Sequence, residues 1–167
     1  SHAAAYALVA YHTAWFKAHH AAAFMAANMS AAADDTDKLH LFWKDAIANG
    51  LKLLAPDINS GEHRFVPVDA KTLRYGLGAV KGTGESAIGA ILKTRVEKGP
   101  FKDLFDLCAR VDKRIVNRRV IEALVRAGAF DSLHGVGERA SVLASVGIAM
   151  EAAEQAERNA NQVSLFG

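Results

Sequence analysis

The sequence predicts a mainly α-helical fold that contains one small β-hairpin. Apolar residues recur at helical spacing along most of the chain. Strand-like runs occur only at residues 64–68 and 72–75, on either side of a turn at Asp69-Ala70. With 51% of its 167 residues apolar, the chain can bury a real core, which we expect to be divided between two small units.

Three helices are expected in the first unit. Residues 3–20 have apolar side chains at helical spacing, and residues 21–29 continue with helix-favouring types. A third helix is expected over residues 38–49, because residues 34–37 offer N-capping side chains and Gly50 can end it. Helices therefore dominate this part of the chain.

More helices are expected beyond residue 100. Residues 101–110 and 117–127 each show a helical pattern, and a tight basic turn at residues 111–116 joins them. Gly128 can end the second of these helices. A last long helix is expected over residues 138–160.

The turn Gly82-Thr83-Gly84 separates two short apolar helical segments. Glycine adopts positive φ and allows close approach of the main chain, so N–H groups of this turn can point at a phosphate. Ser86 and the first turn of the next helix add donors and a positive dipole end, and Lys81 adds a cation. No base-reading side chain is evident here, so we expect the contact to hold the phosphate backbone without regard to sequence.

Other glycine-based phosphate sites do not fit this spacing. A P-loop needs a Lys-Ser/Thr pair after its second glycine, whereas Glu85 follows Gly84. A dinucleotide-binding site needs a longer strand before its glycines than residues 73–75. The glycines could instead only make a tight turn between helices, with Glu85 at the helix N-terminus, and the sequence leaves that alternative open.

A second, degenerate unit of the same plan is expected at residues 101–127. Its turn lacks the Gly-x-Gly pattern, but basic and polar side chains gather near the N-terminus of the helix that follows it. They are Lys113, Arg114, Asn117 and Arg118. Together the two units predict a tandem helix-hairpin-helix, in which both turns contact a nucleic-acid backbone.

Charge is concentrated in the middle of the chain. The net charge is only +2, but residues 71–120 contain twelve Lys and Arg against five Asp and Glu, and both flanks are acidic. A basic block of this kind favours a polyanionic partner such as DNA. A solvated basic face is the alternative, and the salt dependence of binding distinguishes the two.

Composition excludes several other classes of function. No apolar run is long enough to span a membrane, and the first residues lack a basic signal-peptide region, so we expect a cytoplasmic protein without membrane partners. Cys108 is the only cysteine, so no internal disulfide can form. His12, His19 and His20 lack further ligands at metal-binding spacing, so we expect no metal site. No catalytic residue and no cofactor are predicted for this chain.

Several stretches together resemble the bacterial DNA polymerase III alpha subunits, the replicative C-family polymerases. In chain order they are SHAAAYALVAYHTAWFKAHH, AAFMAANMS, NGLKLLAPDINSG, YGLGAVKGTGESAI and FKDLFDLCARVDKRIVNRRVIEALVRAGAFD. The resemblance implies a segment that runs from the end of the fingers through a tandem helix-hairpin-helix region. In this family that region holds double-stranded primer-template DNA behind the polymerase site.

The resemblance also implies roles that belong to the longer parent protein. The palm, whose carboxylates bind Mg²⁺ for nucleotidyl transfer, lies upstream in the family, so we expect the segment to be inactive by itself. Other replisome subunits are implied as partners of the parent. The start of the chain would lie near the incoming nucleotide there, which makes His2 and Tyr6 candidate contacts in the parent only.

The sequence QVSLF near the C-terminus resembles the pentapeptide with which bacterial replication proteins bind the sliding clamp. Leu165 and Phe166 would anchor in a hydrophobic pocket, while the amide of Gln162 would form hydrogen bonds at its rim. The resemblance thus implies the clamp, the beta subunit, as a partner of a mobile tail. The alternative is that the Leu-Phe pair packs on its own domain.

We therefore predict five segments and one function with two alternatives. The segments are residues 1–55, the helical end of the fingers; 56–62, a connector; 63–134, the β-hairpin with the tandem helix-hairpin-helix; 135–160, a long helix; and 161–167, the clamp-binding tail. The function is non-sequence-specific binding of duplex DNA together with clamp attachment. The alternatives are a structural or protein-interaction module and a helix-hairpin-helix DNA-repair enzyme.

Overall fold

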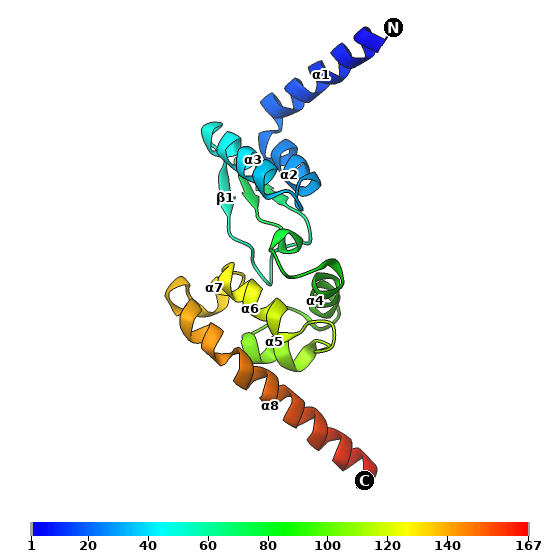
Figure 1. Cartoon of the computed structure of the whole chain (residues 1–167), viewed down its shortest axis with the longest axis vertical. Helices are drawn as coiled ribbons and strands as arrows, with labels where there is room; N and C mark the ends of the chain where they lie inside the picture. Colours follow the sequence, from blue (N-terminus) through cyan, green and yellow to red (C-terminus); the bar gives the residue numbers. More distant parts are fainter. Residues whose placement is uncertain (1, 167) are drawn as a thin grey trace.

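The computed structural model describes residues 2–166, with side chains described up to residue 164, and confirms a mainly α-helical fold with a small sheet. The molecule is elongated, and α1 (His2–His19) and α8 (Arg139–Phe166) project from its opposite ends (Figure 1). Between them follow α2 (Ala21–Ala31), α3 (Thr36–Ala48), β1 (Lys52–Leu54), β2 (Val66–Asp69), β3 (Thr72–Arg74), the 3₁₀ helix η1 (Leu77–Ala79), α4 (Glu85–Lys98), α5 (Leu104–Arg110), α6 (Arg118–Arg126), α7 (Asp131–His134) and the 3₁₀ helix η2 (Val136–Glu138).

The small sheet contains one strand that the sequence pattern missed. β2 and β3 form the predicted antiparallel hairpin, with an irregularity between Pro67 and Asp69. β1 pairs with β3 in parallel, placing Leu53 opposite Leu73, so the strand order is β1-β3-β2. A strand of three residues is too short to show alternation, and only its pairing with β3 reveals it.

A first hydrophobic core lies where α2 and α3 pack against this sheet. Met25, Met29, Phe65 and Leu73 are among its buried side chains. Asp35 caps α3 as predicted, because its side chain accepts a hydrogen bond from the N–H of residue 38 at 3.1 Å. This core fixes the position of the chain that leads from β3 into η1.

The helix α1 stands apart from that core. None of its described residues is buried, and its aromatic side chains Tyr6 and Trp15 are 74% and 41% exposed. Near its C-terminal end, Lys17 pairs with Asp45 of α3 at 2.8 Å. The helix is thus held by its connection to α2 and by this ion pair rather than by buried apolar surface.

A second, larger core is formed by η1, α4, α5, α6 and α8. Its fully buried side chains include Ile88, Ile91, Leu107 and Ile121. The helices predicted at residues 101–110 and 117–127 correspond to α5 and α6. Gly128, with φ of +88°, follows α6 and ends it as expected.

Residues 56–62, predicted as a connector between units, are packed into the second core. Ile58 is fully buried, and its N–H donates to the carbonyl of Ala129 at 2.8 Å. The side chain of Asn59 makes two hydrogen bonds, of 2.7 and 2.8 Å, with the backbone of Phe101, 42 residues further along the chain. This connector is therefore packed into the second core and held there by hydrogen bonds.

The last helix is longer than the sequence pattern predicts. α8 extends to residue 166, whereas we expected a helix over residues 138–160 followed by a separate tail. Val146 and Ala149 are among the side chains that bury one face of its first half. Every residue from 154 to 164 is exposed, so the helix continues into solvent through most of the predicted tail.

Candidate nucleic-acid interface

The first hairpin, residues 80–84, joins η1 to α4 and contains the predicted Gly-Thr-Gly turn. Gly82 and Gly84 have φ of +93° and +75°, the left-handed region that glycine adopts without strain. Thr83 is buried and both glycines are exposed. The turn is therefore anchored by its central side chain and presents its glycine backbone to solvent.

Thr83 itself shapes this turn, which corrects its predicted role as a DNA contact. Its N–H donates to the carbonyl of Val80 at 3.3 Å. Its hydroxyl lies 2.8 Å from the same carbonyl and 3.3 Å from the carbonyl of Leu77. Because both donors of Thr83 are used inside the hairpin, neither is available to a phosphate.

The remaining backbone donors of the first hairpin are open. Within the described residues, the N–H groups of Gly82 and Gly84 donate to no carbonyl or side chain. Gly84 is the N-cap of α4 and has no side chain that could satisfy the first-turn N–H groups, and Ser86 adds an exposed hydroxyl there. Nothing lies within 4 Å of the point where a Cβ of Gly84 would stand, so a phosphate oxygen can approach closely.

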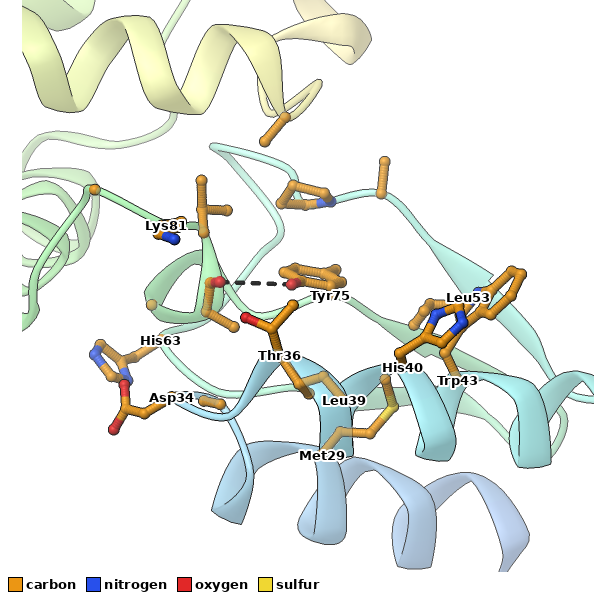
Figure 2. A pocket seen from close by; sticks show the side chains of 18 of the residues that line it. Met29, Asp34, Thr36, Leu39, His40, Trp43, Leu53, His63, Tyr75 and Lys81 are labelled. Carbon is orange, nitrogen blue, oxygen red and sulfur yellow. Dashed lines mark hydrogen bonds between the residues drawn. The ribbon is translucent and has the colours of Figure 1, made fainter.

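A cleft of about 910 Å³ opens beside the first hairpin, between it and α3 (Figure 2). Lys81 and His63 lie toward one side of the cleft, and the rings of His40 and Trp43, stacked at 5.8 Å, lie toward the other. Among the side chains described, no carboxylate lies within ion-pair distance of Lys81. Lys81 is thus an exposed cation next to the open N–H groups of the turn.

The second hairpin, residues 111–117, also precedes a helix, but its polar side chains form hydrogen bonds within the hairpin and with the start of that helix. The side chain of Asn117 caps α6 by accepting from the N–H of Val120 at 3.1 Å. Asp112 accepts from the N–H of Arg114 at 3.0 Å and from its guanidinium at 2.8 Å. The hydrogen bonds from Arg114 lower the pKa of Asp112 to about 2, because they favour the carboxylate.

The predicted cations of the second hairpin have acidic partners. The ammonium nitrogen of Lys113 lies 3.0 Å from a carboxylate oxygen of Glu157 in α8. The Nε of Arg118 lies 2.7 Å from a carboxylate oxygen of Glu122 in α6. Glu157 and Arg118 are exposed, whereas Lys113 and Glu122 are partly shielded, so each pair still meets solvent, where a phosphate can replace the carboxylate. These side chains are available to DNA only in exchange for their present partners.

Part of the basic block at residues 71–120 is turned inward. The guanidinium of Arg110 donates to the carbonyl of Gly99 at 2.6 Å. The guanidinium of Arg95 donates to the carbonyl of Gly61 at 2.7 Å. These two arginines fasten loops of the second core, so the positive charge that faces solvent is smaller than the count of basic residues suggests.

Both hairpins lie in a segment that matches a known family. The family described as the helix-hairpin-helix motif matches residues 50–141, which include the sheet and all elements from α4 to η2. The chain belongs to the helix-hairpin-helix family.

This helix-hairpin-helix chain is also similar, along nearly its whole length, to DNA polymerase III alpha subunits, as the resemblance predicted. It is 52% identical over 166 residues to that of Neisseria meningitidis serogroup B, a match that covers 99% of this chain and 14% of the relative. It is 48% identical over 169 residues to that of Escherichia coli strain K12 and 49% to that of Vibrio cholerae serotype O1, covering all of this chain and 14% of each relative. The chain thus spans about a seventh of the length of these relatives.

The other predicted contact residues belong to α1 and to the end of α8. His2 and Tyr6 belong to α1, which projects from the end of the molecule opposite α8 (Figure 1). Gln162 is exposed near the end of α8, and the side chains of Leu165 and Phe166 lie outside the described ones. These two groups therefore lie near opposite ends of the molecule, and Gln162 follows Glu157, the partner of Lys113 in the second hairpin, by five residues.

Within residues 2–166, no three His, Cys, Asp or Glu side chains gather closely enough to hold a metal ion. His19 instead stacks on Trp15, with ring centroids 4.5 Å apart. Cys108 is buried, and burial raises the pKa of its thiol to about 11, so it behaves as an inert core residue. No helix in the described part of the chain is both long and apolar enough to cross a membrane.

The sequence predicted the cations of the second hairpin but not the carboxylates that pair with them. Glu157 is 44 residues away from Lys113, so no local pattern could pair them. Arg118 and Glu122 are four residues apart, a spacing that favours an ion pair on one face of a helix. That second pairing could have been predicted from the sequence.

Proposed function

We propose that this chain binds duplex DNA through its two hairpins and holds the phosphate backbone without regard to base sequence. The observation that carries the proposal is the open first hairpin, in which the N–H groups of Gly82 and Gly84 have no partner among the described residues and Lys81 stands beside them. A phosphate is the ligand that such a turn at the positive end of a helix prefers. Contacts of this kind position a duplex but read no sequence.

The second hairpin contributes through side chains rather than through its backbone. Lys113, Arg114 and Arg118 would exchange their carboxylate partners for DNA phosphates, and Asn117 would keep the turn in shape by capping α6. Each exchange trades one ion pair for another, so its net gain comes mainly from the counterions that DNA releases. We therefore expect the first hairpin to contribute more to affinity than the second.

The relatives suggest a setting for this activity. They are named DNA polymerase III subunit alpha, and we propose that the chain steadies primer-template DNA as one part of such a replicative polymerase. Template-directed synthesis with Mg²⁺ and contacts with other replisome subunits would then belong to the longer protein, in which His2 and Tyr6 would face the incoming nucleotide. We expect no DNA synthesis by this chain alone.

Fluorescence-anisotropy titration of the chain with a primer-template duplex at several salt concentrations tests the DNA proposal. Each phosphate contact changes the slope of log K against log salt by about −0.9, so we expect binding at low salt that weakens steeply as salt rises. Lys81→Glu places a carboxylate beside the bound phosphate, and we expect it to raise Kd about tenfold.

Lys98→Glu is the matched control for this variant. Lys98 is exposed and lies at the other end of the 14-residue α4, about 20 Å from the hairpin, so the same change of charge leaves the turn untouched. Equal losses for Lys81→Glu and Lys98→Glu would mean that net charge alone matters and would remove the first hairpin from the site. Absence of binding at low salt would favour a structural or protein-interaction module.

A second candidate function, attachment to the bacterial sliding clamp, is favoured by the exposed end of α8. Residues 154–164 are all exposed, so Gln162 is accessible to a partner. We propose that Gln162, Leu165 and Phe166 bind the clamp. This contact would tether the DNA-binding hairpins beside the clamp at a high effective concentration and so prolong their stay on DNA.

Binding of the chain to purified sliding clamp tests the second proposal. Replacing Leu165 and Phe166 together by alanine is expected to abolish binding, because apolar anchors supply most of the energy of a small interface. Gln155→Ala is the control, since Gln155 is an exposed glutamine about two turns earlier on the same helix. If wild type does not bind, or if the double variant binds equally well, the clamp proposal fails and the DNA proposal is unaffected.

A further inference from the structure

The first hairpin packs against the middle of α6, the helix that follows the second hairpin. A Cβ on Gly82 would stand 3.9 Å from the Cβ of Ala123. Ala127, one turn later, lines the cleft beside Lys81. Since Asn117 of the second hairpin is the N-cap of α6, the first half of this helix spans the distance between the two hairpins.

Arg119 shares a face of α6 with Ala123. Residues four apart lie one above the other on a helix, and the opposite face of α6 is buried through Ile121 and Leu124. Arg119 is exposed, two residues after the N-cap and one turn before the contact with Gly82. Arg119 therefore lies on the solvent-exposed face of α6, between the second hairpin and the contact with Gly82.

Arg119 also differs in charge environment from the other arginines of α6. Arg118 and Arg126 both pair with Glu122, at 2.7 and 3.3 Å, whereas no carboxylate among the side chains of residues 2–164 lies within ion-pair distance of Arg119. The first turn of α6 contains no acidic residue, although the positive end of a helix dipole favours one. Because two arginines also lie at that end, the N-terminus of α6 strongly favours a bound anion.

The two hairpins place different donors at equivalent points. Ser86 is the second residue after the N-cap Gly84, and Arg119 is the second residue after the N-cap Asn117. In α4 the backbone donors are open, whereas in α6 the side chain of Asn117 occupies the N–H of the third helical residue. A guanidinium at this point supplies the donors that the cap has taken, in a planar fork that matches a phosphate.

We propose that Arg119 is the main phosphate contact of the second hairpin and joins the two hairpins into one continuous phosphate-binding surface. The inference rests on the proposed DNA binding and names a residue that the sequence patterns did not single out. Its ligand is the phosphate backbone of duplex DNA, held by two parallel hydrogen bonds from the guanidinium. Arg118, which is held by Glu122, contributes less.

Anisotropy titration with the same primer-template duplex tests this assignment. We expect Arg119→Ala to raise Kd about tenfold and to reduce the magnitude of the salt slope by about one, the signature of one lost phosphate contact. Arg119→Lys keeps the charge but not the fork, so its Kd should fall between those of wild type and Arg119→Ala. Arg118→Ala should raise Kd less than Arg119→Ala does.

Arg126→Ala is the matched control. Arg126 is an exposed arginine of the same helix, and its removal leaves Glu122 paired with Arg118. Its Kd is expected to stay close to that of wild type, and urea unfolding of each variant checks that the fold is retained. A rise in Kd for Arg119→Ala no larger than that for Arg118→Ala or Arg126→Ala would overturn the assignment.

The Lys81→Glu variant separates failure of this inference from failure of the proposed function. If wild type binds DNA and Lys81→Glu weakens binding while Arg119→Ala does not, DNA binding by the first hairpin stands and the role of Arg119 falls. If wild type shows no binding at low salt, both fall together.

Discussion

Thr83 is a buried polar side chain in a turn that otherwise faces solvent. It is 4% exposed, and its hydroxyl lies 2.8 Å from the carbonyl of Val80 and 3.3 Å from that of Leu77. The position before the N-cap in the second hairpin is Val116, which is fully buried. The same space is therefore filled in both hairpins, but only the first turn, bent by its glycines, uses a hydroxyl to satisfy carbonyls.

Thr83→Val is expected to lower the free energy of unfolding by about 1 kcal/mol, because the valine fills the space but cannot replace the hydrogen bond of the hydroxyl, and the carbonyl of Val80 keeps only the N–H of residue 83 as its donor. Urea unfolding measures the loss. Thr83→Ser is the control, since it keeps the hydroxyl and removes only a methyl group. A valine variant as stable as wild type would show that the hydroxyl does not hold the turn.

The two ends of α4 serve different purposes. Its N-terminus is left open by Gly84, whereas its C-terminal end is closed by Arg110 of α5. The guanidinium of Arg110 donates to the carbonyls of Gly99 and Pro100 at 2.6 and 3.1 Å and lies 4.5 Å above the ring of Phe101. A cation at a helix C-terminus also complements the helix dipole, so this end is stabilised within the protein, whereas the other end is the one at which we propose a phosphate.

Arg110→Lys is expected to destabilise the chain by about 2 to 3 kcal/mol, since an ammonium cannot make several directed hydrogen bonds and stack on an aromatic ring at once. Thermal unfolding followed by circular dichroism measures the change. Binding of DNA at a temperature where the variant stays folded should match that of wild type. Weaker DNA binding by the folded variant would contradict the assignment of Arg110 to the interior.

Tyr75 connects the two hydrophobic cores. Its side chain packs against both of them, with its ring 4.6 Å from that of Phe65 in the first core. Its hydroxyl donates to the carbonyl of Ala79, just before the first hairpin, at 3.5 Å (Figure 2). Both tryptophans of the chain, Trp15 and Trp43, lie in α1 and α3, so their fluorescence reports on the first part alone.

Tyr75→Ala is expected to lower the free energy of unfolding by about 2 to 3 kcal/mol and to uncouple the two cores, because it removes a ring that both share. In urea, the fluorescence transition should then separate from the transition in far-ultraviolet circular dichroism, which reports on all helices. Tyr75→Phe keeps the ring and should leave the two transitions as they are in wild type. Coincident transitions in the alanine variant would contradict this coupling.

Patterns within a few residues predicted much of the fold. The helices α3, α5 and α6 were expected from apolar spacing and from caps such as Asp35, and the β2–β3 hairpin from its turn. β1 and the packing of residues 56–62 were not, because their partners lie far along the chain. The end of α8 was missed because its polar, exposed last turns resemble a tail in composition.

Local sequence patterns also predicted only part of the candidate site. The glycine turn, the cations near it and the family resemblance are local chemistry, since positive φ, helix capping and motif spacing are properties of neighbouring residues. Which of those groups are available is a property of the folded chain. Glu157 reaches Lys113 because α8 packs against α5, and Ala123 lies beside Gly82 because the first hairpin and α6 share one core. Local chemistry therefore suggested the kind of ligand that we propose, and long-range packing decided which residues remain available to it.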